Sequence, residues 1–236
     1  MKHGNRKREK SLFPFSLKKM DGTMPQSTDN WSEFDWENAF KADDARVNLY
    51  MRELFRYIDL PCEDELVMRR LSNDPQYRKI NDPALTEKLV RYFRKRSNSD
   101  DPENEDDGNW MKRDGASSFM LFSRLARLWA QEFALAKTLP PAPFLRISCA
   151  YGQLLLQSSD LMDLVEEDPR SRSLKASIAK RMLARINFIC GELNTLEEAY
   201  SSCRESCQYH FRSLMESREK IIAFLFRIRK EGNKNG

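Results

Sequence analysis

Glycine and histidine are scarce in this 236-residue sequence, which has eight glycines and two histidines. The glycines never form the Gly-x-Gly-x-x-Gly pattern of dinucleotide-binding loops or the Gly-Lys-Ser/Thr loop that holds nucleotide phosphates. The histidines are His3 and His210, so a His-Glu-x-x-His metal site is excluded and a Ser-His-Asp triad would depend on His210 alone. We therefore expect a protein without a cofactor and without enzymatic activity.

Long apolar runs and cysteine pairs are also missing. The longest apolar run, residues 221–226, is about a third of the ~18 residues that a membrane span needs. No apolar stretch of about 7 to 15 residues follows the charged start of the chain, as it would in a signal peptide. The five cysteines are an odd number without the spacing of a disulfide framework. These absences predict a cytoplasmic protein with reduced thiols and no transmembrane segment.

The composition favours helices over strands. Apolar residues make up 40% of the chain and charged residues 32%, with fourteen phenylalanines and ten methionines against the eight glycines. Leu, Arg and Glu, which are good helix formers, are frequent. We predict an all-α fold without a sizeable sheet.

Charge and periodicity divide the chain into four segments. Residues 1–29 carry seven Lys/Arg against three acidic residues and lack periodicity, which predicts an arm that is disordered until it binds something. Within this arm, Phe13 and Phe15 could dock locally. Residues 98–108 carry six acidic residues and no base, a composition typical of a linker. We predict a basic arm over 1–29, a small helical domain over 30–97, an acidic flexible linker over 98–116 and a bundle over 117–232.

Apolar spacing and prolines predict the helices of the small domain. A first helix from Trp31 to Ile58 has apolar residues at i, i+3, i+4 and i+7, among them Val47, Tyr50, Met51, Leu54, Phe55 and Ile58. A second helix starts after Pro61 with three acidic residues in its first turn and stops at 72–75. A third helix starts at Pro83.

The C-terminal segment has helical spacing over three stretches, 117–136, 143–164 and 171–230. A single helix over the last stretch would be roughly 90 Å long, which the two preceding helices could not cover. Two capping-box patterns, Thr195-x-x-Glu198 and Ser202-x-x-Glu205, predict a break between Asn194 and Ser202. The segment is therefore predicted to form an antiparallel four-helix bundle.

Two sets of side chains have the spacing of metal ligands. Cys203, Cys207 and His210 stand at i, i+4 and i+7 of one helix and are weak candidates for a zinc site, although free cysteines are more often core residues. The acid pairs Asp160/Asp163 and Glu216/Glu219 share helix faces, which leaves a helical metal-dependent hydrolase or transferase as a second alternative function. We expect no bound metal, because such spacings arise by chance on charged helices.

Basic residues suggest nucleic acid as an alternative partner. The segment 91–96 places bases beside aromatic residues at the end of the third predicted helix, and the arm adds further cations. The candidate nucleic-acid-binding residues are Lys7, Arg8, Lys10, Lys18, Lys19, Arg91, Arg94, Lys95 and Arg96.

Aromatic residues at the start of the small domain suggest a protein interface. Large aromatic side chains are typical anchors of such interfaces, and four of them fall within ten residues: Trp31, Phe34, Trp36 and Phe40. They could instead fold back on their own domain. We expect a non-enzymatic interaction subunit of a multiprotein complex. Whether that complex handles nucleic acid and whether the chain forms homo-oligomers are both left open. A stand-alone nucleic-acid-binding protein is the first alternative.

Overall fold

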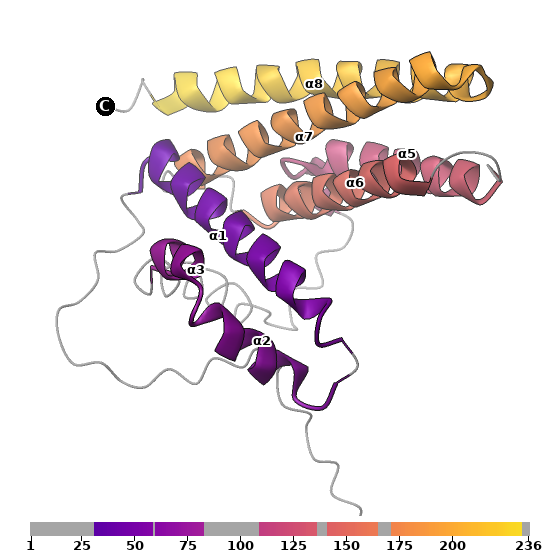
Figure 1. The fold of residues 1–236 in the computed structure, drawn as a ribbon. Coiled ribbons are helices and arrows are strands. Elements are labelled where there is room, and N and C mark those ends of the chain that lie inside the picture. Colours follow the sequence, from indigo (N-terminus) through magenta and orange to yellow (C-terminus); the bar gives the residue numbers. More distant parts are fainter. Residues whose placement is uncertain (1–30, 59, 83–108, 136–140, 165–170, 233–236) are drawn as a thin grey trace, which may run out of the picture.

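The computed structural model describes residues 31–58, 60–82, 109–135, 141–164 and 171–232 (Figure 1). All regular elements in these ranges are helices, which confirms the predicted all-α fold class. They are α1 (Glu33–Leu54), α2 (Glu63–Leu71), α3 (Pro75–Ile80), η2 (Asn109–Lys112), α5 (Ala116–Leu135), α6 (Pro141–Met162), α7 (Ser171–Ala199), η3 (Ser201–Cys203) and α8 (Arg204–Gly232). None of the helices in these ranges is both long enough and apolar enough to cross a membrane.

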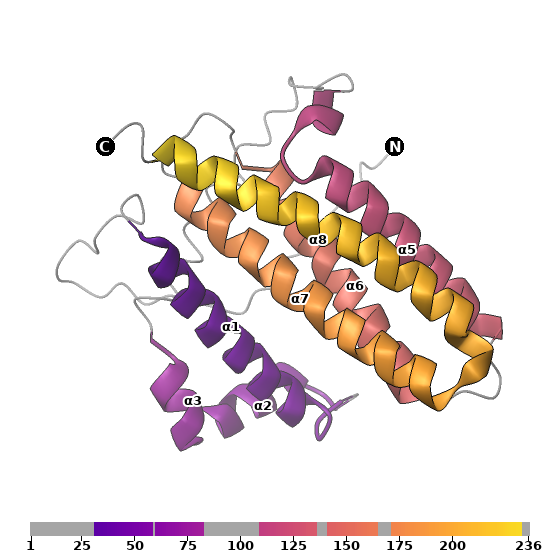
Figure 2. The ribbon, with the colours of Figure 1, turned by 90° about the horizontal axis from the view of Figure 1, so that it is seen from above.

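Helices α5, α6, α7 and α8 lie side by side around one apolar core, here called the bundle (Figures 1 and 2). Trp129 of α5 is fully buried and stacks on Phe144 of α6, with 4.6 Å between the ring centroids. Its indole N–H donates a hydrogen bond of 3.1 Å to the carbonyl oxygen of Phe144. This arrangement is compatible with the predicted four-helix bundle.

The chain between α7 and α8 turns at Tyr200, inside the interval where a break was predicted. The backbone there is extended, with φ −138° and ψ 100°, and the short helix η3 leads into α8. The predicted capping role of Thr195 is wrong, because its hydroxyl donates to the carbonyl oxygen of Gly191 within α7. The turn lets α8 run back along α7 (Figure 2).

Helix α1 lies beside α7, and its first half belongs to the core of the bundle (Figure 2). Trp36 is 3% exposed and packs into that core. The hydroxyls of Ser173 and Ser177 on α7 donate to the carbonyl oxygens of Trp31 and Glu33, at 2.7 and 2.9 Å. The start of α1 is thus held by both apolar and polar contacts.

Ion pairs extend the contact between α1 and the bundle. Glu33 contacts both Lys180 and Arg229, and Arg181 binds Asp44 through two hydrogen bonds of 2.9 Å. Burial by itself would raise the pKa of Glu33, but the hydrogen bonds with Lys180 and Arg229 outweigh it and lower the pKa. Helix α1 therefore joins the predicted small domain to the predicted bundle.

A second, smaller core lies between the end of α1 and helices α2 and α3. It contains Leu49, Val67, Leu71 and Tyr77. Helix α3 was not predicted: Asp74, which was expected only to end α2, accepts hydrogen bonds from two backbone N–H groups in the first turn of α3. The third predicted helix, from residue 83, lies outside the described residues.

The last part of the predicted linker is built into the bundle. Asp114 accepts from Lys175 at 3.1 Å and from Arg227 at 2.6 Å. Gly115 has φ +89°, and a Cβ atom there would lie 2.7 Å from the carbonyl oxygen of Ser158 on α6. The flexible linker predicted over 98–116 therefore cannot include 109–116, while 98–108 lie outside the described residues.

Candidate interaction surface

Four large apolar side chains on α1 and the turn that continues it are exposed. Val47 is 52% exposed, Met51 43%, Phe55 72% and Ile58 53%. Their spacing of four, four and three residues places them along one side of the helix. We call these four residues the α1 row. Leu60, just beyond it, is 49% exposed.

The α1 row remains exposed because α1 contacts the rest of the chain with other sides. Its first half faces the bundle through Trp36, and its second half faces α2 and α3 through Leu49 and Glu53. The apolar residues predicted to form one stripe over 47–58 therefore lie in two environments. Tyr50 and Leu54 are partly buried against the small core, whereas the α1 row is exposed. Apolar residues on more than one side of this helix are the signal that sequence reasoning missed.

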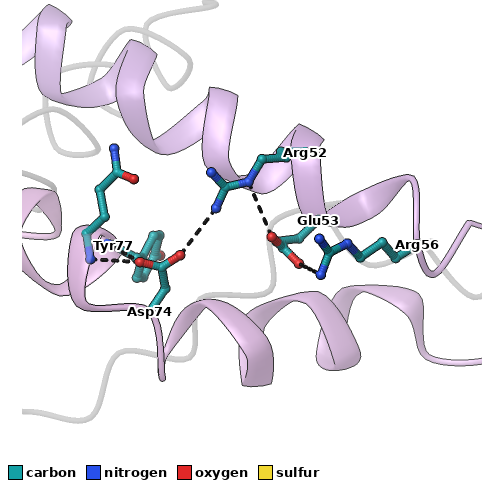
Figure 3. A network of polar contacts seen from close by, with 6 residues as sticks. Arg52, Glu53, Arg56, Asp74 and Tyr77 are labelled. Atoms are coloured by element: carbon teal, nitrogen blue, oxygen red, sulfur yellow. Dashed lines mark hydrogen bonds and ion pairs between the residues drawn. The ribbon is translucent and has the colours of Figure 1, made fainter.

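A polar network holds the far end of α1 against α3 (Figure 3). The Glu53 side chain, 5% exposed, accepts from Arg52 and forms an ion pair with Arg56 at 3.2 Å. Arg52 also reaches Asp74, at 3.3 Å, and Asp74 in turn caps α3 through the backbone N–H of Tyr77. Of these contacts, the one between Arg52 and Asp74 joins the end of α1 to α3, and the two to Glu53 lie within the α1 segment.

Carboxylates lie at both ends of the α1 row. At the end nearer the bundle, Asp43 pairs with Arg46 and Asp44 with Arg181, and the two carboxylate side chains remain 49% and 50% exposed. At the other end the first turn of α2 contains three acidic residues, Glu63, Asp64 and Glu65. Asp64 accepts a hydrogen bond from Tyr50, which raises the pKa of the Tyr50 hydroxyl to about 12. Such a surface favours a ligand that has apolar residues in its middle and basic residues at its two ends.

Three of the four aromatic residues predicted as a protein interface pack against the chain itself. Trp31 and Trp36 form an edge-to-face pair with centroids 4.7 Å apart, and Phe40 lies under the guanidinium of Arg181 at 4.7 Å. All three contact the core of the bundle. Only Phe34 is largely exposed, at 67%. Trp36 is buried and cannot reach a partner while α1 stays docked, whereas Trp31 and Phe40 are only partly buried. All three pack on the predicted bundle and not, as the alternative had it, on their own small domain.

The predicted nucleic-acid-binding residues lie outside the described part of the chain. This holds for the arm residues Lys7, Arg8, Lys10, Lys18 and Lys19 and for the segment residues Arg91, Arg94, Lys95 and Arg96. Their role remains a prediction.

The predicted metal candidates Cys203, Cys207 and His210 make other contacts. Cys203 donates to the carbonyl oxygen of Tyr200 at 3.1 Å, and burial raises the pKa of the Cys207 thiol to about 12. Among the described residues, no group of three His, Cys, Asp or Glu side chains is arranged to hold a metal ion. Neither acid pair forms such a group with other residues, and Glu219 pairs with Arg218 at 3.1 Å.

His210 instead belongs to a polar cluster inside the bundle. It is fully buried, and its Nδ1 is hydrogen-bonded to the hydroxyl of Tyr151 at 2.7 Å. Glu132 of α5 lies on its other side, with Oε1 3.8 Å from Nε2, too far for a hydrogen bond, and accepts from the hydroxyl of Ser206. The cluster links α5, α6 and α8, and Trp129 packs edge-on against His210 with 5.3 Å between the ring centroids.

We expect Glu132→Gln to lower stability at neutral pH and to lose this effect in acid. Burial would raise the pKa of Glu132, but its interactions with His210 and Ser206 outweigh burial and lower it. A carboxyl group whose pKa is lower in the folded state than in the unfolded state stabilises the fold at pH values above its unfolded-state pKa. This stabilisation is lost as the pH falls through its folded-state pKa. The difference in urea midpoint between wild type and variant should therefore be largest near pH 7 and shrink toward zero below about pH 4.

The exposed carboxylate Glu65 supplies the control for this change in net charge. Glu65→Gln should leave the urea midpoint close to that of wild type at pH 7, because exposed single substitutions usually change stability by about 0.5 kcal/mol or less. A Glu132→Gln deficit that stays constant from pH 7 to pH 3 would show that the carboxylate charge is not what stabilises the bundle.

No family model matches the chain, and neither curated proteins nor solved structures show a significant match to it.

Proposed function

We propose that the chain is a non-enzymatic interaction subunit of a multiprotein complex and that the α1 row binds its partner. The α1 row is the observation that supports this: its side chains are 43% to 72% exposed, although the helix that carries them is buried on two other sides. Exposed apolar patches on soluble proteins commonly mark interaction sites. The small core around Leu49 and the contact between Arg52 and Asp74 hold the end of α1 against α2 and α3.

The chemistry around the α1 row defines the partner segment. From Val47 to Ile58 the row is about 16 Å long at helical rise. Carboxylates stand at both ends, from Asp43 and Asp44 on one side and from the start of α2 on the other. The segment that fits presents apolar side chains over about the same length, with basic residues before and after them.

The thiols support a reducing location for this complex. All five cysteines are free, and two of them, Cys190 and Cys207, are buried. Burial raises the pKa of Cys190 to about 11, which makes its thiol unreactive at neutral pH. We propose the cytoplasm, as expected from the sequence.

The test compares capture by the wild-type chain with capture by a row variant, Val47→Ser, Met51→Gln, Phe55→Ser and Ile58→Ser together. Tagged proteins are recovered from the native host with and without nuclease, and partners are identified by mass spectrometry. We expect a stoichiometric partner that survives nuclease and is lost with the row variant. A synthetic peptide of its apolar segment with basic flanks should displace it from the wild-type chain.

Phe34→Ser is the matched control, because Phe34 is an exposed aromatic residue on the same helix outside the α1 row. This variant should keep the partner. Retention of every partner by the row variant would exclude the row as the binding surface. Loss of the partners on nuclease treatment, together with recovered nucleic acid, would instead support the nucleic-acid-binding alternative.

A further inference from the structure

The N-terminal arm contains a segment of the kind that fits the α1 row. Four large apolar residues, Leu12, Phe13, Phe15 and Leu17, fall within six positions. Basic residues stand on both sides of them, with Arg6, Lys7, Arg8 and Lys10 before and Lys18 and Lys19 after. This is the reverse of the α1 row, whose apolar side chains lie between carboxylates.

The two surfaces also agree in length. An extended segment from Leu12 to Leu17 spans about 17 Å at roughly 3.4 Å per residue. The row spans about 16 Å. Pro14 restricts its own φ and biases Phe13 toward extended backbone, so the segment is better suited to lie along a helix as an extended strip than to form a helix itself.

The covalent connection is long enough for the arm to reach the row of its own chain. Thirteen residues lie between Leu17 and Trp31, and the fourteen steps from one Cα to the next can span up to about 48 Å. The near and far ends of the row, Val47 and Ile58, lie about 24 and 40 Å from Trp31 at helical rise. Both ends are within reach, so no second molecule is needed.

We infer that residues 12–17 of the arm occupy the α1 row of the same chain and compete with the partner for it. This inference rests on the proposed function of the row. A short tether gives a local concentration in the millimolar range. A segment that binds as a free peptide with a Kd of about 100 μM would then cover the row about 90% of the time and weaken partner binding about tenfold.

The first experiment maps the arm in the full-length chain. Phe15 is replaced by the photo-crosslinking residue benzoylphenylalanine, the protein is irradiated at low micromolar concentration, and crosslinked peptides are identified by mass spectrometry. We expect crosslinks within one chain to residues 47–58, and we expect their loss when the four row substitutions are added. Crosslinks that join two chains would overturn the inference in favour of a second copy on the row.

The second experiment measures competition with a fluorescent peptide of residues 8–22. An arm variant of the full-length chain, with Leu12, Phe13, Phe15 and Leu17 changed to Ser, should bind the peptide about tenfold more tightly than wild type, because its own arm no longer competes. Adding the row substitutions to the arm variant should abolish binding. Equal affinity of wild type and arm variant, or binding that survives the row substitutions, would overturn the inference.

The two experiments separate this inference from the proposed function. Partner capture that depends on the row, without peptide binding, leaves the proposed function standing and removes the arm as competitor. Peptide binding that depends on the row, without a captured partner, supports the arm and removes the proposed function.

Discussion

Replacing Asp114 by alanine should lower the free energy of unfolding by about 3 to 5 kcal/mol, as removal of one partner of a buried ion pair commonly does. The Lys175 side chain is 3% exposed, and Asp114 lies 3.1 Å from its ammonium group. Without Asp114 the ammonium stays buried and uncompensated. Equilibrium unfolding in urea, followed by circular dichroism, measures the loss.

Two further variants identify the buried charge as the cause. Lys175→Met in the Asp114→Ala background should recover most of the lost stability, because an apolar side chain of similar length removes the unpaired charge. Arg227, the second partner of Asp114, has a side chain that is 56% exposed. Arg227→Ala should therefore lower the free energy of unfolding by at most about 1 kcal/mol. If Asp114→Ala costs no more than Arg227→Ala, the ammonium group of Lys175 does not depend on Asp114.

Trp36→Ala should destabilise the protein by about 3 to 5 kcal/mol, the usual cost of removing a buried tryptophan. Trp36 is 3% exposed and joins α1 to the core of the bundle. The cavity lies in the contact between α1 and α7, so the variant should also show faster amide hydrogen exchange in α1 than in α5 and α6. Urea unfolding and hydrogen exchange with mass spectrometry measure the two effects.

Phe34 provides the comparison, because it stands two residues away on the same helix and is 67% exposed. Phe34→Ala should change stability by about 0.5 kcal/mol or less. A Trp36→Ala variant that is as stable as Phe34→Ala but loses a partner would return Trp36 to the interface predicted from the sequence.

Periodicity and prolines located most of the described helices because both act locally. Apolar spacing predicted α1, α5 and α6 to within a few residues, and proline predicted the start of α2. The turn at Tyr200 fell where two capping patterns predicted it, although Thr195 caps nothing. The six-residue helix α3 is too short to leave a periodic signal, and only its Asp-Pro start was visible.

The candidate surface was harder to predict because burial depends on partners far away in the sequence. Periodicity shows that α1 has apolar residues on more than one side. It does not show that α7 covers one side, that α2 and α3 cover another, or that no residue in the described part of the chain covers the α1 row. Lys175 looks like a surface residue until the loop before α5 brings Asp114 to it, 61 positions earlier in the chain. Trp36 was predicted to be an interface anchor because the residues that bury it, in the bundle, are also far away in the sequence.

The contact between α1 and α7 has a consequence for synthesis on the ribosome. The hydrogen bonds that hold the start of α1 join residues 142 to 144 positions apart. At about 5 to 20 residues per second, the start of α7 is made roughly 7 to 30 s after α1. During that time Trp31, Trp36 and Phe40 have no α7 to pack against. Every nascent chain therefore presents three bare aromatic side chains to the cell before its own binding site for them exists.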